Sequence, residues 1–235
     1  MPDTDSMVGP AHPDPGRIPS FVRHRTRLTE GQQNAWDRWW PVYGGDVAEV
    51  SSVGALFLRE APLVLEIGTG NGEATARMAA AEPATNLLGV EVYEPGLAHL
   101  LIRLREAEIE NLRLLRGDAV DLLERAVPER SLAGIRLYFP DPWPKRRHHK
   151  RRLVQPEFAA LAASRLVPGG FLHLATDWAH YADQMLAVCD ACAALERDEA
   201  MDPWLPRPDS RPLTKFEERA VREGRDIRDL LYRSR

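Results

Sequence analysis

The stretch Leu63-Val-Leu-Glu-Ile67, followed at once by Gly68-Thr-Gly-Asn-Gly72, decides how this chain of 235 residues folds. The first five residues form a short apolar run that is typical of a buried strand. The three glycines behind it permit a sharp turn and a close backbone approach, and they lead into a helical pattern near residues 73–81. A strand, a tight turn and a helix in this order predict the first unit of a parallel sheet.

The same alternation continues along the chain, where each strand pattern is followed by a helical pattern after a short connection. This predicts an α/β protein with a mostly parallel, doubly wound sheet and helices on both faces. In such sheets, ligands bind beyond the carboxyl ends of the strands. The expected strands lie near 63–67, 87–91, 112–115, 135–139 and 171–175, and the expected helices near 73–81, 95–108, 119–126, 155–166 and 179–195.

Composition and length fit one large domain. A hydrophobic content of 44% is ample for a buried core, and no apolar run approaches the roughly 20 residues that a membrane-spanning helix needs. Residues 1–16 hold four prolines, three aspartates and no apolar run, so we expect a disordered leader and not a signal peptide. The single domain is therefore expected to cover residues 17–235.

The formal charge of −4 is unevenly distributed along the chain. Residues 145–152 carry six Lys/Arg and no acid, and residues 17–27 carry four Arg and no acid. A polyanion would be repelled by the acidic remainder and attracted to these two segments. The alternative is that each segment is merely a solvated face, but neighbouring like charges repel, which disfavours this interpretation for the denser cluster.

The cysteines and histidines show no metal-binding pattern. Cys189 and Cys192 form a C-x-x-C pair, but a zinc site needs two further ligands at a matching spacing, which the sequence lacks. Both cysteines fall in an Ala-rich helical pattern, so we expect ordinary buried helix residues and a cytoplasmic protein without structural disulfides. The seven histidines have no ligand spacing either, and no metal site is predicted.

An acidic residue stands at or near the end of each of the first three strands. Glu66 precedes the glycine turn, and Glu91 follows at the spacing at which an acid accepts hydrogen bonds from ribose hydroxyls. Asp118 either binds an adenine amino group or caps the following helix, and its context favours neither. The dinucleotide fingerprint G-x-G-x-x-G would require glycine where this chain has Glu73, which disfavours a nicotinamide cofactor.

The fourth strand runs into Tyr138-Phe-Pro-Asp-Pro-Trp-Pro-Lys145. The prolines restrict φ around Asp141 and Trp143, so this carboxylate and ring are presented with little conformational entropy left to lose. Trp143 either stacks on a base or braces the loop, and the sequence does not decide between these roles. Asp177, after the fifth strand, either joins the same edge as a ligand or caps the next helix.

The strand-end acids and glycines together resemble the S-adenosylmethionine site of class I methyltransferases over residues 63–177. With further segments included, the match covers nearly the whole chain, and it resembles the bacterial tRNA (guanine-N7-)-methyltransferase family. The segments that carry this resemblance are Ser20-Phe-Val-Arg23, Leu65-Glu-Ile-Gly68, Phe139-Pro-Asp-Pro-Trp-Pro-Lys145, Leu153-Val-Gln-Pro-Glu-Phe158, Thr176-Asp-Trp178 and Thr214-Lys-Phe-Glu217.

The resemblance implies a Rossmann-like class I methyltransferase fold and methyl transfer from S-adenosylmethionine to N7 of a guanine in the variable loop of tRNA. The domain would then comprise a basic N-terminal extension (17–60), a cofactor-binding core (61–178) and C-terminal helices with a substrate segment (179–235). The implied cofactor-binding residues are Glu66, Gly68, Gly70, Glu91, Asp118 and Asp141; the substrate-binding residues are Lys145, Asp177, Thr214, Lys215, Phe216 and Glu217; and the RNA-binding residues are Arg147, His148, His149, Lys150, Arg151 and Arg152.

Guanine N7 carries a free lone pair, so its methylation needs alignment with the methyl donor and no removal of a proton. We therefore expect Asp141 to be the catalytic residue in a positioning and electrostatic sense, because a fixed carboxylate stabilises positive charge that moves onto the purine. Asp141 or Asp177 also suits the N–H donors of the guanine Watson–Crick edge. Two alternatives stay open: methylation of an exocyclic amino group, and a non-catalytic RNA-binding protein on a decayed methyltransferase scaffold. We expect a monomer or a homodimer.

Overall fold

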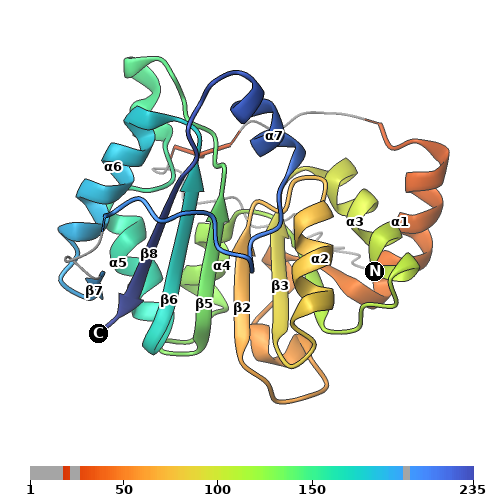
Figure 1. The fold of residues 1–235 in the computed structure, drawn as a ribbon. Coiled ribbons are helices and arrows are strands. Elements are labelled where there is room, and N and C mark those ends of the chain that lie inside the picture. Colours follow the sequence, from red (N-terminus) through yellow and green to blue (C-terminus); the bar gives the residue numbers. More distant parts are fainter. Residues whose placement is uncertain (1–17, 22–26, 198–201) are drawn as a thin grey trace, which may run out of the picture.

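The computed structural model describes residues 18–21, 27–197 and 202–235, with the backbone only for Lys215. The expected leader (1–16) and most of the N-terminal basic segment therefore lie outside the described residues. Figure 1 shows the arrangement of the helices and strands. Their bounds are α1 (Glu30–Tyr43), β1 (Gly44–Asp46), η1 (Val47–Glu49), η2 (Val53–Leu56), β2 (Leu63–Ile67), α2 (Glu73–Ala81), β3 (Asn86–Glu91), α3 (Glu94–Glu106), β4 (Leu112–Arg116), α4 (Ala119–Arg125), β5 (Leu132–Tyr138), η3 (Arg146–Arg151), α5 (Pro156–Arg165), β6 (Leu166–Thr176), α6 (Ala179–Asp190), β7 (Leu195–Glu196), α7 (Lys215–Arg222) and β8 (Arg228–Ser234).

The sheet has the strand order β1-β4-β3-β2-β5-β6-β8-β7. Its strands β1 to β6 pair in parallel, whereas β8 runs antiparallel to both β6 and β7. The chain proceeds from β2 through β3 to β4, and then returns to the other side of β2 to form β5 and β6. This reversal opens a crevice at the carboxyl ends of β2 and β5, where doubly wound sheets bind ligands.

Side-chain alternation along β2 separates the hydrophobic core into two layers. Leu63, Leu65 and Ile67 belong to the layer that contains α4, α5 and α6, whereas Val64 belongs to the layer of α1, α2 and α3. Figure 1 shows α2 in front of the sheet and α4 behind it. A strand covered on both faces must be apolar at nearly every position, which explains why residues 63–67 read as a continuous apolar run.

The predicted parallel core is confirmed, with its five strands and the helices between them, but the C-terminal part differs from the prediction. The helix expected over 179–195 ends at Asp190, and the region expected to hold C-terminal helices also contains the antiparallel strand β8. Its pattern was hidden because Asp229 is buried inside it. Helix α1 was also not predicted, although Thr29 and Gln32 form a capping box at its start.

The two cysteines are free. Cys189 is buried in α6, as expected, and burial raises the pKa of its thiol to about 12. Cys192 lies beyond the end of that helix and is only half-buried, because the helix is shorter than its sequence pattern indicates. Among the described residues, no cluster of His, Cys, Asp and Glu is arranged to hold a metal ion. Within the same residues, no helix combines the length and apolarity needed to cross a membrane.

Close packing between α3 and the glycine turn gives a test of this fold. A methyl group on Gly96 would collide with the carbonyl oxygen of Gly70. We expect Gly96→Ala to lower the free energy of unfolding by about 1–3 kcal/mol, because the helix and the turn must separate. In the control Gly31→Ala on α1, the new methyl group meets nothing within 4 Å, so stability should be unchanged or slightly higher. Equal stability of the two variants in urea denaturation would contradict this packing.

Candidate active site

A cavity of about 380 Å³ opens at the carboxyl edge of the sheet, where the strand order reverses. Its walls are the turns that follow β2, β3, β4 and β5, together with segments from near both ends of the chain. The structure brings together at this cavity all six residues expected to bind the cofactor, which are Glu66, Gly68, Gly70, Glu91, Asp118 and Asp141. Ser20, Phe21, Leu153, Thr214 and Phe216 complete the opposite walls.

The main chain of the glycine turn after β2 faces the cavity without a covering side chain at Gly68 and Gly70. Gly68 and Gly70 have φ angles of +80° and +55°, which residues with a Cβ atom rarely adopt. A Cβ atom built at either position would meet no other atom within 4 Å. The turn therefore leaves open space in which a ligand can approach the main chain closely.

Glu91 connects the turns after β2 and β3 by hydrogen bonds. Its Oε1 accepts hydrogen bonds from the backbone N–H groups of Val92 (2.7 Å) and Tyr93 (3.0 Å), and its Oε2 accepts one from Gly70 (2.8 Å). Burial raises the pKa of the Glu91 carboxyl, and these three N–H groups oppose that shift. Since a carboxylate offers about four acceptor sites, Glu91 keeps capacity for a further donor such as a hydroxyl group.

Glu66 is the most perturbed acid of the site. Its side chain is 4% exposed, and burial raises the pKa of its carboxyl to about 7 against the opposing effects of Thr75 and Arg136. Its Oε2 is buried without a hydrogen-bond partner among the described residues. A buried carboxylate oxygen of this kind is suited to a cationic donor such as an ammonium group.

Asp118 caps α4, because the N–H of Val120 donates to its carboxylate (2.9 Å). The sequence left the roles of cap and ligand equally open, and the structure shows that the capping residue also lines the cavity. The cap fixes the direction of the carboxylate without ruling out a contact with a ligand.

Asp141 lies at the cavity on a strained loop. Phe139 and Trp143, two residues before and after it, have φ angles of +53° and +45°, a backbone strain of about 1–3 kcal/mol each that persists only where the surroundings hold it. Arg152 provides part of this support, since its Nε donates to the carbonyl of Pro142 (2.8 Å). The proline-restricted presentation of Asp141 is thus reinforced by tertiary contacts.

Trp143 braces this loop against the N-terminal segment. Its indole N–H donates to the carbonyl of Ser20 (2.9 Å), and the guanidinium of Arg151 lies 3.9 Å from the centre of its ring. Arg151 also donates to the carbonyl of Phe21 (3.5 Å), and the His148 ring stands edge-on to the indole. Because the indole N–H and one ring face are engaged, these contacts favour the bracing role over stacking on a base.

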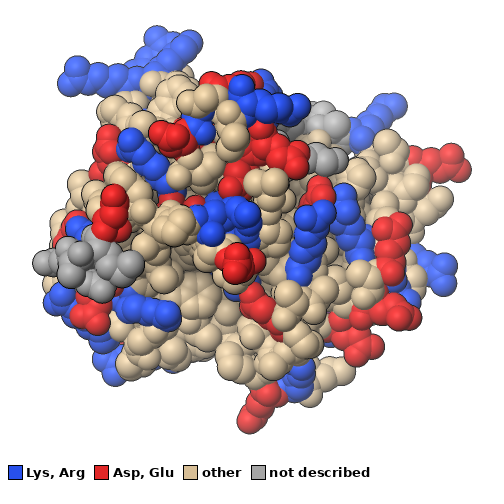
Figure 2. Space-filling view, viewed as in Figure 1, with Lys and Arg blue, Asp and Glu red and all other residues tan. Residues whose placement is uncertain are grey.

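The basic segment of residues 145–151 projects into solvent, largely as the short helix η3. Figure 2 shows basic side chains extending from the upper left of the molecule, where Figure 1 draws this segment in green. Arg147 and Lys150 are exposed, as RNA-contacting residues must be, and Lys145, which is expected to bind the substrate, is exposed as well. Desolvation and the surrounding cations lower the pKa values of His148 and His149, which disfavours the charged form of both rings.

Arg152 differs from this segment and corrects a prediction. It is 2% exposed, and its Nη1 contacts His180 Nδ1 (2.9 Å) and Gln184 Oε1 (2.8 Å) on α6. Its guanidinium also lies 4.8 Å from the centre of the Tyr181 ring. A side chain held in this position cannot reach a phosphate at the surface. We therefore replace the expected RNA contact of Arg152 with a role inside the protein, where it joins the Asp141 loop to α6.

Asp177 is not part of the cavity wall. Its Oδ2 accepts a hydrogen bond from Nε of Arg225 (2.8 Å) in the segment that follows α7. It does not cap α6, because that helix begins after Trp178 without a side-chain cap. The helix-cap interpretation is therefore wrong, whereas the expected contact of Asp177 with the substrate stays a prediction. In the described structure, Asp141 is the one of these two acids that lines the cavity.

The expected substrate segment is split between the cavity and the protein interior. Thr214 caps α7 by accepting from the N–H of Glu217 (3.1 Å), and both Thr214 and Phe216 line the cavity. The side chain of Lys215 lies outside the described structure. Glu217 is buried, and its Oε2 accepts from Nη1 of Arg211 (2.6 Å). Since this carboxylate is occupied inside the protein, its expected contact with the substrate is not supported.

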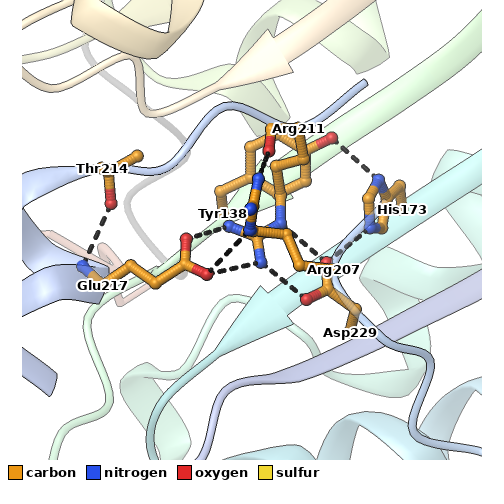
Figure 3. Close-up of polar contacts among 7 residues, drawn as sticks. All are labelled: Tyr138, His173, Arg207, Arg211, Thr214, Glu217 and Asp229. Atoms are coloured by element: carbon orange, nitrogen blue, oxygen red, sulfur yellow. Dashed lines mark hydrogen bonds and ion pairs between the residues drawn. The ribbon is translucent and has the colours of Figure 1, made fainter. Parts of the chain in front are cut away.

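A buried ionic cluster anchors this segment (Figure 3). Arg211 is 0% exposed and donates from Nε and Nη2 to the two oxygens of Asp229 (2.8 and 2.7 Å), as well as to Glu217. His173 Nε2 contacts Asp229 Oδ1 (2.8 Å), and its Nδ1 contacts the Tyr138 hydroxyl (2.8 Å). This cluster was not predicted, because a lone Arg in a loop and a lone Asp near the C-terminus look like solvated residues.

Comparisons with known proteins identify the family of the chain. Residues 60–230 match a family model described as "Putative methyltransferase". The chain is 50% identical over 223 residues to the tRNA (guanine-N(7)-)-methyltransferase of Halorhodospira halophila, covering 94% of this chain and 96% of that protein. It is 50% identical over 230 residues to the same-named protein of Methylococcus capsulatus, covering 98% and 99%. The chain belongs to the tRNA (guanine-N(7)-)-methyltransferase family. The resemblance seen in the sequence motifs is confirmed.

Two solved structures share the fold. The 16S rRNA methyltransferase KamB has a TM-score of 0.52 and 16% identity, covering 75% of this chain and 89% of its own. The antibiotic-resistance methyltransferase Kmr has a TM-score of 0.51 and 17% identity, covering 77% and 91%. At this identity the likeness shows the fold alone, and it confirms the expected Rossmann-like class I methyltransferase architecture.

The cavity of this family member fits S-adenosylmethionine, which carries an ammonium group, a ribose and an adenine. The orphaned Oε2 of Glu66 suits the ammonium group, and Glu91 retains capacity for a hydroxyl donor. The glycine turn leaves space beside its main chain. A volume of about 380 Å³ also lies within the range of pockets that enclose small ligands.

The raised pKa of Glu66 predicts a pH-dependent stability of the unliganded chain. Its carboxyl binds a proton more tightly in the folded chain, so the folding penalty is absent below pH 4.5 and grows as the pH rises to about 7. We expect Glu66→Gln to raise the free energy of unfolding by on the order of 3 kcal/mol at pH 8 and by much less at pH 5. The exposed Glu106→Gln serves as control in the same denaturation series, and an effect of Glu66→Gln that is equal at both pH values would disprove the explanation.

Proposed function

We propose that this chain transfers a methyl group from S-adenosylmethionine to N7 of a guanine in the variable loop of tRNA, forming 7-methylguanosine. The proposal is carried by the position of Asp141, which lies on a strained, proline-bracketed loop at a cavity whose other walls fit the methyl donor. The names of relatives that are 50% identical over nearly the whole chain support the same activity. We include in the proposal one domain over residues 17–235 and a cytoplasmic monomer or homodimer.

In this proposal, three acids and the glycine turn at the strand ends hold the methyl donor. Glu66 binds its ammonium group, and Glu91 accepts hydrogen bonds from its ribose hydroxyls. The turn at Gly68 and Gly70 lets it pack closely against the main chain. Asp118 stands at the end of the cavity assigned to adenine. When bound, S-adenosylmethionine supplies a methyl group on a positively charged sulfur, and guanine N7 accepts it without losing a proton.

Asp141 would act on the guanine through charge and position. A carboxylate accepts hydrogen bonds, so it suits the N1–H and N2–H donors of guanine and discriminates against adenine. Positive charge moves onto the purine during methyl transfer, and a fixed negative charge nearby stabilises that state more than the ground state. The strained loop holds the carboxylate in place before the substrate arrives, which keeps the cost of orientation low.

The exposed basic segment binds the RNA. Lys145, Arg147 and Lys150 begin four residues after Asp141 and continue away from the cavity along η3. A folded RNA is recognised largely by its shape and its phosphates. A polyanion held along this segment would therefore place a neighbouring nucleotide near Asp141.

The direct experiment is incubation with labelled S-adenosylmethionine and unmodified tRNA, followed by mass spectrometry of the digested nucleosides. The proposal requires 7-methylguanosine, formed only when both substrates are present. Methylation of an exocyclic amino group would instead give N2-methylguanosine. Binding of tRNA without any methyl transfer would indicate the non-catalytic alternative.

Substitution of the two candidate acids separates their roles. We expect Asp141→Asn to lower kcat by about 10²-fold, because it removes the charge that stabilises the methylated purine, while both ligands still bind. Asp177→Asn should have a smaller effect, since its carboxylate is paired with Arg225 and does not line the cavity. Near-normal turnover by Asp141→Asn would remove Asp141 from the catalytic role.

Salt dependence tests the RNA-contacting segment. If Arg147 and Lys150 each neutralise one phosphate, their replacement by Ala should weaken tRNA binding and flatten the slope of log affinity against log salt by about 0.7–0.9 per residue. Arg235→Ala is the matched control. This exposed arginine follows β8, which runs antiparallel to β6, so it lies at the amino ends of the parallel strands, away from the cavity. Fluorescence anisotropy with labelled tRNA measures the slopes, and an unchanged slope would exclude the substituted residue from the interface.

A further inference from the structure

The buried Arg211 lies between a wall of the active site and the body of the protein. We infer that Arg211 is a positioning residue that acts through Asp229 and Glu217 to hold the segment of Thr214 and Phe216 at the cavity that Asp141 also lines. This inference rests on the proposed methyl transfer to tRNA. It goes beyond that proposal by assigning a function to a group that touches neither substrate.

The segment of Thr214 and Phe216 is held at few places besides Arg211: Ala220 of α7 is buried, and Arg225 after that helix pairs with Asp177. Figure 1 shows α7 beyond the carboxyl ends of the strands, away from both helix layers. Residues 206–213, which lead into it, contain neither helix nor strand. Phe216 lines the cavity but is 67% exposed. The place of Thr214 and Phe216 is therefore set largely by whatever fixes the neighbouring residues.

Arg211 provides that fixation through a fork of hydrogen bonds (Figure 3). Two of its nitrogens hold Asp229 on β8, and a third holds Glu217 on α7. Burial acts to raise the pKa of Asp229, but hydrogen bonds from His173 and Arg211 hold it below its usual range. Because a buried charge without its partner is strongly unfavourable, any displacement of α7 that separates Glu217 from Arg211 is resisted.

The same cluster reaches the strand that carries Asp141. The guanidinium of Arg211 lies 5.7 Å and 5.5 Å from the ring centres of Tyr138 and Phe139, at the end of β5. The Tyr138 hydroxyl contacts His173, which contacts Asp229 in turn. The buried guanidinium of Arg211 therefore contacts the end of β5, which leads to Asp141, and it also holds α7, which begins after Thr214.

This geometry also explains why Glu217 belongs to the positioning group. Its Oε2 faces Arg211 at 2.6 Å, and its Oε1 lies 3.3 Å from Arg211 and 3.5 Å from Arg207. Both oxygens are thus directed toward arginines in the interior. Glu217 influences the substrate only through the helix it anchors and through Thr214, which accepts its backbone N–H.

Asp229→Asn is the most informative variant, because Asp229 is 1% exposed and cannot touch RNA. We expect kcat for tRNA methylation to fall by roughly 10- to 100-fold, the loss that a small misplacement of the substrate causes. The Kd for S-adenosylmethionine should not change. Arg211→Lys is the second variant: it keeps a cation between the two carboxylates but cannot form the fork, so it should show the same selective loss.

A double-substitution cycle distinguishes positioning from direct contact. If Asp229 and Glu217 both act through Arg211, the Asp229→Asn/Glu217→Gln chain should turn over little more slowly than the slower single variant. Independent, multiplying losses would show that Glu217 contacts the substrate itself, and they would overturn the inference.

Arg165→Lys is the matched control, because this largely buried arginine lies at the amino ends of β5 and β6, away from the cavity at their carboxyl ends. It should change the melting temperature at most, and leave kcat unaltered. Normal kcat in Asp229→Asn and Arg211→Lys, or a parallel loss of S-adenosylmethionine binding, would refute the positioning role. Absence of 7-methylguanosine with the wild-type chain would instead refute the proposed function.

Discussion

Parallel pairing of β2 with both β3 and β5 is the constraint on which the rest of the structure depends. Leu65 lies opposite Leu88 on one side and Ile135 on the other, so the first strand of the parallel core is also its central one. The turns that follow β2 and β5 must then diverge, which opens the crevice between them. Glu66, the glycine turn and Asp141 all reach the same cavity because they lie at or just beyond the carboxyl ends of these two strands.

Two buried arginines extend this scaffold to the parts of the site that the sheet does not reach. Arg152 joins the Asp141 loop to α6, and Arg211 joins Glu217 of α7 to Asp229 of β8. Burial of a guanidinium is costly unless its partners compensate, so each favours one arrangement of its neighbours. Arg211 is paired with Asp229 and Glu217, whereas Nη2 of Arg152 is buried without a hydrogen-bond partner among the described residues. The strained backbone at Phe139 and Trp143 persists beside them for the same reason.

The parallel core and the cofactor edge could be predicted from the sequence, because both follow from local patterns. A strand buried on two faces is a largely apolar run, as residues 63–67 show. An acid at the end of each strand can be located from the sequence, because it directly adjoins that run. Arg152 could not be separated from Arg147 and Lys150, since the three look alike in a basic segment. Its burial depends on His180 and Gln184, which approach it only in the folded chain. Strand β8 was missed because its buried Asp229 has a partner, Arg211, that no spacing reveals.

The binding of S-adenosylmethionine at the crevice between β2 and β5 is tested most directly by hydrogen–deuterium exchange with and without the cofactor. Slower exchange is expected at the amides of residues 68–72, 92–93 and 117–119, which line the cavity. Exchange in β7 and around Leu205, where another hollow lies, should not change. Protection at that second hollow, with none at residues 68–72, would contradict a methyl-transfer site at this edge of the sheet.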